Sequence, residues 1–329
     1  MAKYIVCSGC SFTRQQKRLG LDGDTTNFMY DVVDMWRWPH WIQKMHPKKI
    51  VYNMGNPTNG NNIIAVSTIS KVTELLKKGI DPNDIQVFIQ WSDMIREGFF
   101  LSQSTLDLFD YKVDVNPDKG YNVAAHTNFF ANKNKNLNKY GHYVINSGSD
   151  CDHIDDKLRK LVLGSVSSYV SIERATIRFY ESILLIQNFL KLNGIKYLMF
   201  NYPRNFSFEN SSAEYNLKNN YNKKIPKNIF DFKYDNPYID YFIENVDWDN
   251  IWFYEDDNTN VGGLIDFAIM NYDYDRDGKL FMEHQLDSSK NVEELVKIHK
   301  KQKSYHSGHI SSNMNKIFVE KILQKYLDN

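Results

Sequence analysis

The stretch "VCSGCSFT", residues 6–13, marks the first change in the chain from apolar to polar residues. It follows Tyr4 and Ile5, so residues 3–7 are predicted to form a short buried strand. Gly9 permits a sharp turn after this strand. Ser11 then lies near the predicted start of a helix, where free backbone N–H groups favour developing negative charge. The stretch therefore predicts a strand, a tight turn and a serine presented as a nucleophile.

Cys7 and Cys10 in the same stretch also form a Cys-x-x-Cys pair. A structural zinc site of this kind needs a second pair of ligands, and only Cys151 remains in the chain. A thioredoxin-like redox motif would open a clear helix, which the following residues favour only weakly. The Gly-x-x-x-x-Gly-Lys pattern of a phosphate-binding loop is absent. The serine interpretation is therefore preferred over the metal, redox and phosphate ones.

Outward from this stretch, apolar runs and helical patterns alternate along the chain. Such alternation is typical of βαβ units and a mostly parallel sheet, whose ligands bind at the carboxyl ends of the strands. Two segments interrupt it, at about 100–165 and 204–305, and we interpret them as insertions within a single domain spanning 1–329. The further strands are expected at 48–55, 85–91 and 195–203, and the helices at 61–79, 168–193 and 311–327.

The composition narrows the class of protein. The 329 residues are 42% hydrophobic and 14% aromatic, which is enough for a real core and argues against disorder. Forty basic and forty acidic residues cancel, so nucleic acid is not an expected partner. The longest apolar stretch, at 182–190, is far shorter than the roughly 18–20 residues of a membrane span. With no visible signal peptide and three cysteines, we expect a cytoplasmic protein that does not bind a membrane.

Three later stretches place polar residues after predicted strands or before the last helix: "YNMGNPTNGNN" (52–62), "VFIQWSDMIRE" (87–97) and "YHSGHISSNMNKIF" (305–318). In this order the chain resembles the SGNH (GDSL-like) hydrolase family, particularly its divergent phage versions, with Gly9-Cys10-Ser11 in place of Gly-Asp-Ser. The resemblance covers the core strands and the last helix. It implies an α/β fold with a three-layer α/β/α, flavodoxin-like parallel sheet carrying two insertions, and it suggests a phage-encoded protein.

The resemblance also assigns the catalytic residues. Ser11 would be the nucleophile, and His309 would be the base that accepts its proton. The family places an aspartate two or three residues before this histidine, where the chain has Ser307 and His306. His306 is kept as a candidate, but a neutral replacement of such an aspartate can cost around 10⁴-fold in rate. A dyad oriented by a backbone carbonyl, a carboxylate from the second insertion, and loss of activity with the fold retained all stay open.

The same comparison implies the groups that would hold the oxyanion. They are the backbone N–H of Ser11, a backbone N–H from the turn between Gly55 and Gly60, and an asparagine side chain, with Gly60 and Asn61 closest to the family's second block and Gly55 as the alternative. Ser92 stands where the family has an asparagine, and its hydroxyl can donate one hydrogen bond. Each donor would contribute about 2.7–4 kcal/mol to stabilising the transition state.

Four residues are candidate substrate contacts. Trp91 ends the third predicted strand and Arg96 follows it, and Arg96 would bind an anionic group or pair with a neighbouring carboxylate. Trp248 and Trp252, in the second insertion, are aromatic side chains suited to lining a cleft. A second tryptophan-rich segment, at 34–45, falls where a helix should pack on the sheet, so its tryptophans are expected in the core rather than on a carbohydrate platform: Trp36, Trp38 and Trp41.

The segment "DYDRDGKLFMEH" (273–284) spaces Asp273, Asp275 and Asp277 like the ligands of a calcium loop. His284 occupies the place of the bidentate glutamate, so a solvated acidic turn and a structural Ca²⁺ site are the two interpretations. The reaction itself would need no cofactor.

These observations together predict a serine hydrolase, an esterase that acts through an acyl-enzyme. Its substrate would be a small-molecule or glycan ester, such as an O-acetylated glycan. The alternatives are a catalytically impaired SGNH-fold scaffold that binds a glycan or a virion partner, and an acyltransferase that uses the same residues.

Overall fold

The computed structural model describes part of the chain, and the statements below concern these residues. They are 2–10, 13, 36–55, 60–94, 96–102, 104, 141–146, 172–202, 237–256, 259–271, 310 and 312–328.

A five-stranded sheet, in which every neighbouring pair of strands is parallel, forms the centre of the molecule. Its strands follow the order β2-β1-β3-β6-β7. The middle strand, β3, is buried along its whole length, as expected when both faces of a parallel sheet are covered. The strands are β1 (Tyr4–Ser8), β2 (Ile50–Asn53), β3 (Ile85–Trp91), β6 (Lys196–Asn201) and β7 (Ile251–Trp252). The predicted α/β class and the first four strands are confirmed.

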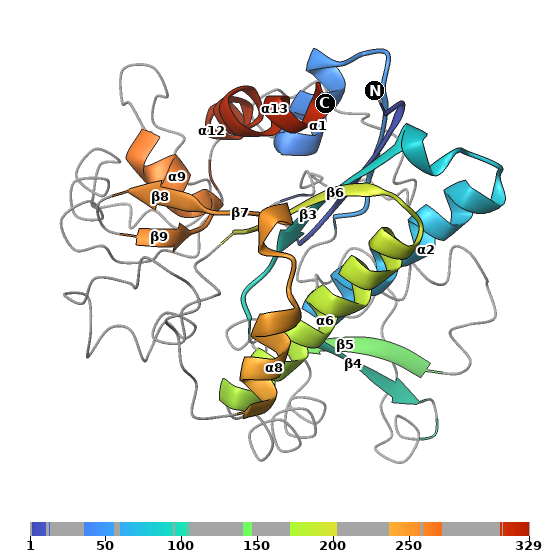
Figure 1. Cartoon of the computed structure of the whole chain (residues 1–329), viewed down its shortest axis with the longest axis vertical. Helices are drawn as coiled ribbons and strands as arrows, with labels where there is room; N and C mark the ends of the chain where they lie inside the picture. Colours follow the sequence, from blue (N-terminus) through green and yellow to red (C-terminus); the bar gives the residue numbers. More distant parts are fainter. Residues whose placement is uncertain are drawn as a thin grey trace.

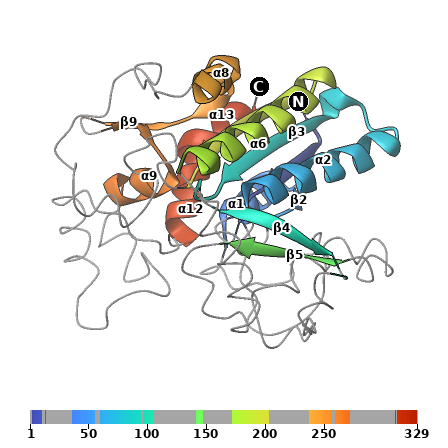
Figure 2. The same ribbon diagram turned by 90° about the horizontal axis from the view of Figure 1, so that it is seen from below.

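Helices cover both faces of this sheet (Figures 1 and 2). Successive strand residues point to opposite faces, so Ile5 and Val6 enter two different buried clusters. One face packs against α1 (Trp38–Met45), α9 (Leu264–Asn271), α12 (Ser312–Phe318), a π-helical turn (Val319–Leu323) and α13 (Gln324–Leu327). The other packs against α2 (Asn61–Lys77), α6 (Ile172–Leu192) and α8 (Pro237–Asn245).

The predicted helix ends have a clear physical cause. Gly79 and Gly194, just beyond α2 and α6, have φ angles of 78° and 64°, a conformation that favours glycine. The chain then turns into β3 and β6, respectively.

Smaller elements lie outside the central sheet. The antiparallel pair β4 (Glu97–Ser102) and β5 (Gly141–Asn146) brackets most of the first predicted insertion. The second predicted insertion contributes the short antiparallel pair β8 (Tyr254–Asp256) and β9 (Thr259–Gly262). This segment also supplies β7, which pairs with β6, so part of it belongs to the central sheet rather than lying above it. Two short 3₁₀ turns, Pro82–Asp84 and Trp248–Asn250, precede β3 and β7, respectively.

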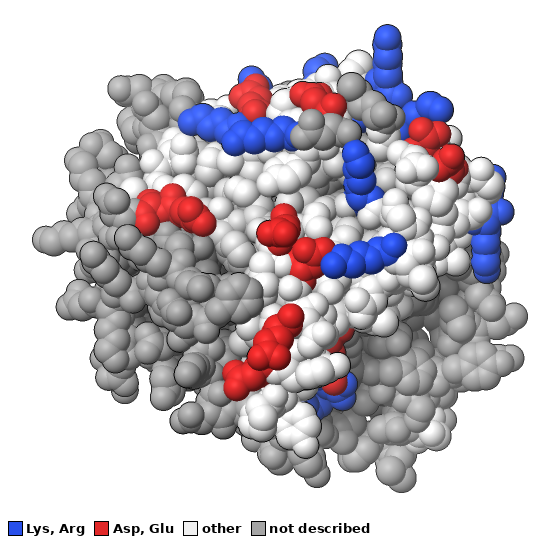
Figure 3. Space-filling model, viewed as in Figure 1, with Lys and Arg blue, Asp and Glu red and all other residues white. Residues whose placement is uncertain are grey.

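The described surface carries both charge signs side by side. Figure 3 shows basic and acidic side chains intermingled over this face. Some form exposed pairs, such as Lys78 with Glu74 at 2.9 Å and Lys3 with Asp84 at 3.1 Å. Among the described residues, the helices are all too short or too polar to span a lipid bilayer.

Candidate functional site

The carboxyl ends of the parallel strands meet at one edge of the sheet, and the strand order reverses there around β1. The connection from β1 to β2 includes α1 on one face, and the connection from β2 to β3 is α2 on the other face. In such a sheet the crevice between the diverging connections, here beside the ends of β1 and β3, is the usual ligand site.

The turn after β1 is unusually close to its neighbours. The backbone N–H of Thr13 donates to the carbonyl of Cys10 at 3.0 Å. A Cβ atom on Gly9 would lie 2.0 Å from the Thr13 Oγ1 atom and 3.0 Å from the carbonyl oxygen of Gln90. Close approach therefore requires the glycine, whereas its φ angle is not among the positive ones.

Gln90, at the end of β3, connects this turn to the rest of the edge. Its Oε1 atom accepts hydrogen bonds from Thr13 Oγ1 at 3.1 Å and from the Trp38 indole at 2.9 Å, and its Nε2 contacts Cys10 Sγ at 3.9 Å. Asn53, at the end of β2, donates to the Thr13 carbonyl at 3.0 Å. Both ends of the turn are thus fixed against β2, β3 and α1.

Sequence reasoning missed Gln90, although a glutamine inside an otherwise apolar strand is a usable signal. Trp38, by contrast, confirms the expectation of a core tryptophan: it is fully buried, and its ring meets that of Phe200 edge-on at 5.4 Å. Trp36 and Trp41 are only partly buried and contact each other at 5.0 Å.

A second set of hydrogen bonds fixes Ile310, the residue that follows His309 in the sequence. The Ile310 carbonyl accepts from the buried guanidinium of Arg37 at 2.9 Å and from the Asn315 amide at 3.3 Å. The Asn315 carbonyl oxygen in turn accepts from the backbone N–H of Trp38 at 3.1 Å. The chain therefore enters α12 in one defined position on α1.

Tyr202, just after β6, lies in the same buried cluster as Cys10 of the first segment and Ile310 of the second. Its hydroxyl forms a hydrogen bond with the backbone of Ile310. Burial raises the pKa of the Tyr202 phenol well above its ordinary value, against the opposing effect of the Arg37 charge, so the group is a neutral hydroxyl. Cys10 and Ile310, the sequence neighbours of Ser11 and His309, lie in the same buried cluster.

Hydrogen bonds of Asn61, at the start of α2, join this helix to the residues that follow β3. The Asn61 side chain accepts from the backbone N–H of Ser92 at 3.0 Å and donates to the Asp93 carbonyl at 2.9 Å, and its backbone N–H donates to the Arg96 carbonyl at 3.0 Å. The side-chain amide and the backbone N–H of Asn61 are therefore used in hydrogen bonds within the protein. Arg96 donates to the Ser92 hydroxyl oxygen at 3.3 Å.

The two glycines of this turn differ. The Gly55 N–H donates to the Asn53 side chain at 2.9 Å. Gly60 is the N-cap of α2, and its N–H has no acceptor among the described residues. Of the predicted backbone donors, Gly60 is the better placed to hold an oxyanion, and that role stays a prediction.

The predicted aromatic contacts all take part in packing. Trp91 is fully buried and its ring meets that of Phe179 at 5.8 Å. Trp248 is partly buried, and its indole donates to a backbone carbonyl in α8 at 3.0 Å. Trp252, also partly buried, packs edge-on against Phe318 at 5.2 Å. Their contact with a substrate stays a prediction.

The remaining predicted site residues lie outside the described residues: Ser11, His306, His309, Asp273, Asp275 and Asp277. Within the described ranges, no cluster of three or more histidine, cysteine, aspartate or glutamate side chains could hold a metal ion. The calcium site therefore stays a prediction.

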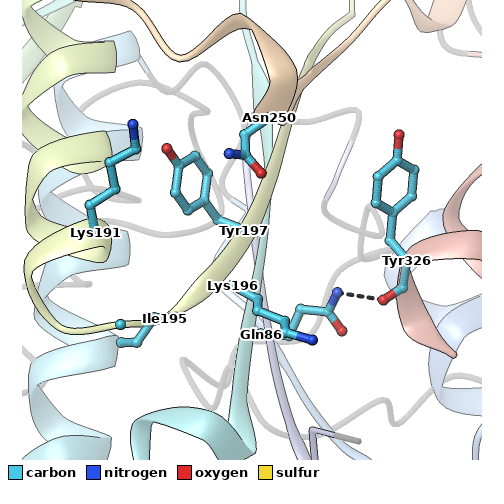
Figure 4. A pocket seen from close by; sticks show the side chains of 8 residues that line it. Gln86, Lys191, Ile195, Lys196, Tyr197, Asn250 and Tyr326 are labelled. Carbon is cyan, nitrogen blue, oxygen red and sulfur yellow. Dashed lines mark hydrogen bonds between the residues drawn. The ribbon is translucent and has the colours of Figure 1, made fainter. Parts of the chain in front are cut away.

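A pocket of about 320 Å³ lies at the opposite, amino end of β3 and β6 (Figure 4). Beside it, one oxygen of Asp247 accepts from Lys191 at 2.6 Å, from Asn250 at 2.9 Å and from the Tyr197 hydroxyl at 3.0 Å. Burial alone would raise the pKa of Asp247, but these hydrogen bonds together lower it. These four side chains form hydrogen bonds with one another and link α6, β6 and the turn before β7. We call this set the brace, and it supports the fold rather than pointing at a ligand.

The carboxyl edge is therefore the better candidate site, since it combines a tight turn, a fixed return segment and buried polar groups. No known family, curated protein or solved structure matches this chain, so the assignment rests on these contacts.

Proposed function

We propose that this chain is a serine hydrolase that cleaves ester bonds, built on a three-layer, flavodoxin-like sheet of the SGNH type. The nucleophile is Ser11 and the general base is His309. The observation that carries the proposal is that Cys10 and Ile310 lie in one buried cluster with Tyr202, because these are the immediate neighbours of the two catalytic residues and stand some three hundred positions apart in the sequence.

In the proposed reaction, the Ser11 hydroxyl attacks the acyl carbon while His309 accepts its proton. The negative charge that develops on the acyl oxygen is held by backbone N–H groups of Ser11 and Gly60, with the Ser92 hydroxyl as a third donor. His309 then gives its proton to the departing alcohol oxygen. Water, deprotonated by His309, cleaves the acyl-enzyme, and the proton returns to Ser11.

One observation favours the second candidate, a binding scaffold without catalysis. The buried Arg37 guanidinium is a single hydrogen bond away from residue 310, and a cation nearby disfavours an imidazolium at 309. A dyad at this place needs a compensating negative charge, and the proposal assigns that role to a carboxylate of residues 204–305.

A serine-directed fluorophosphonate probe tests the proposal. The intact chain should be labelled, the Ser11→Ala variant should not, and His309→Ala should be labelled more slowly by a factor on the order of 10²–10⁴. Ser8→Ala is the matched control, since Ser8 is a buried serine in the same stretch whose hydroxyl donates to Ile64 at 3.4 Å. It should be labelled like the wild type.

Hydrolysis of p-nitrophenyl acetate by the same variants should follow the same order, and product analysis with an alcohol acceptor separates hydrolysis from acyl transfer. Labelling that persists in Ser11→Ala would refute the assignment of the nucleophile. A wild type that stays unlabelled at high protein concentration would favour the scaffold.

A further inference from the structure

Two buried side chains at the carboxyl edge have polar atoms that form no hydrogen bond within the described part of the chain. Trp91 ends β3 and Asn201 ends β6, and the two are partners in the parallel register. Asn201 is 1% exposed and Trp91 is fully buried. The indole Nε1 of Trp91 and both the Nδ2 and Oδ1 atoms of Asn201 have no hydrogen-bond partner among the described residues.

Two other buried asparagines of this edge form hydrogen bonds through both the nitrogen and the oxygen of the side-chain amide. Asn53 donates to Thr13 and accepts from Gly55, and Asn61 likewise uses both side-chain atoms. A buried amide left without partners costs free energy of folding, and such groups are rare in native proteins. Asn201 therefore calls for an explanation that Asn53 and Asn61 do not.

The two side chains share one face of the sheet. Register partners on neighbouring parallel strands point the same way, and Trp91 points toward α6, where its ring meets Phe179. Asn201 follows Phe200, which packs on the opposite face, so alternation places the Asn201 side chain on the α6 face as well. The unsatisfied atoms are thus two donors and one acceptor on adjacent strands.

We propose that Trp91 and Asn201 form a subsite for a neutral secondary amide, such as the N-acyl group of an amino sugar or a peptide bond. The ligand carbonyl accepts from the indole N–H and from the Asn201 amide, and the ligand N–H donates to the Asn201 carbonyl oxygen. Both residues are uncharged and buried, which suits a neutral group and disfavours an ion. This names the substrate class of the proposed hydrolase, and it rests on that function only for where the reacting ester lies.

The test measures stability and binding together. An Asn201→Leu variant loses an unsatisfied amide, so its melting temperature should equal or exceed that of the wild type. The matched control Asn53→Leu loses an amide with two hydrogen bonds and should melt several degrees lower. Binding is measured by calorimetry with three probes, namely di-N-acetylchitobiose, N-acetyl-alanine methylamide and, as a sugar lacking the amide, cellobiose.

The wild type should bind one of the two amide probes and not cellobiose, and which one it binds distinguishes an amino sugar from a peptide. Asn201→Leu should weaken that binding by roughly tenfold or more, the loss of about one hydrogen bond or more. Trp91→Phe, which keeps the ring packing and removes only the N–H donor, should weaken it in the same direction.

Two results would overturn the inference. One is a melting temperature of Asn201→Leu as low as that of Asn53→Leu, which would mean that the fold itself satisfies the amide. The other is a wild type that binds neither amide probe. Ser11→Ala keeps the subsite and should bind as the wild type does, so amide binding by a protein that the fluorophosphonate does not label would refute the esterase and leave the subsite standing.

Discussion

His40 should make the protein sensitive to mild acid. It lies on α1 and is 6% exposed, with its ring stacked near that of Trp36 at 6.4 Å. Burial, and then the charge of Arg37, lower the pKa of His40 to about 3. In the unfolded chain a histidine has a pKa of about 6.5. The folded state therefore keeps the imidazole neutral in a range of pH where the unfolded chain binds a proton.

The sign and size of the effect follow from this difference. Above the unfolded pKa both states are neutral and the stability is fully present. As the pH falls below it, the unfolded state alone gains a proton, and stability is lost down to the folded pKa. Between about pH 7.5 and about pH 5, His40 alone should remove about 2 kcal/mol from the free energy of unfolding. This figure changes little if the folded pKa is one unit higher, because protonation of the folded state is still minor at about pH 5.

Urea unfolding at both pH values, followed by tryptophan fluorescence, measures this loss. In His40→Gln the loss between the two pH values should be smaller than in the wild type by about 2 kcal/mol. His46→Gln, at the end of the same helix, retains His40 and should keep the wild-type difference. If His40→Gln showed the same loss as the wild type, the neutral buried imidazole would be the wrong explanation of the acid sensitivity.

Two further substitutions test the turn and the brace. Gly9→Ala places a methyl group 2.0 Å from Thr13 Oγ1, so the free energy of urea unfolding should fall by an amount typical of overpacking, about 1–3 kcal/mol, and Gly9→Ala/Thr13→Ala should recover part of it. An unchanged midpoint in Gly9→Ala would argue against the close approach. Because the pKa of Asp247 is lowered, its contribution is present above the unfolded value and is lost as the pH falls through the folded one. Asp247→Asn should therefore be less stable than the wild type at neutral pH, with the two converging as the pH falls through the lowered pKa of Asp247 in an acid titration followed by circular dichroism, and a constant difference would contradict the Lys191 pairing.

The main elements could be predicted from the sequence because their patterns are local. The runs that became β3 and β6 are continuous and apolar, and the helices α2 and α6 end beside glycines that permit a left-handed conformation. The two-residue strand β7 was missed, since Ile251 and Trp252 are too few to show any period. Only pairing with β6, which is a long-range contact, identifies it as a strand.

The candidate site was predicted less completely, because the partners of a polar side chain are not visible in its neighbours along the chain. Arg37 is a residue type that is almost never fully buried without a partner, yet it is 1% exposed and holds the carbonyl of Ile310. Tyr202 follows an apolar run and carries no sequence signal of its contact with residue 310. These contacts depend on the return of the chain to α1, which local patterns do not specify.

The polar groups of the carboxyl edge divide into those that fix the chain and those that are not used by the fold. Gln90 and Asn53 fix the turn after β1, whereas Trp91 and Asn201 lie unsatisfied at the ends of β3 and β6. The ends of β1 and β6 are separated by β3 and hence by two strand spacings, or about 10 Å. If both proposals hold, the best substrates carry an amide about 10 Å from the ester. A series of esters with the amide at increasing distance should then show a maximum in kcat/KM, and Asn201→Leu should remove that maximum.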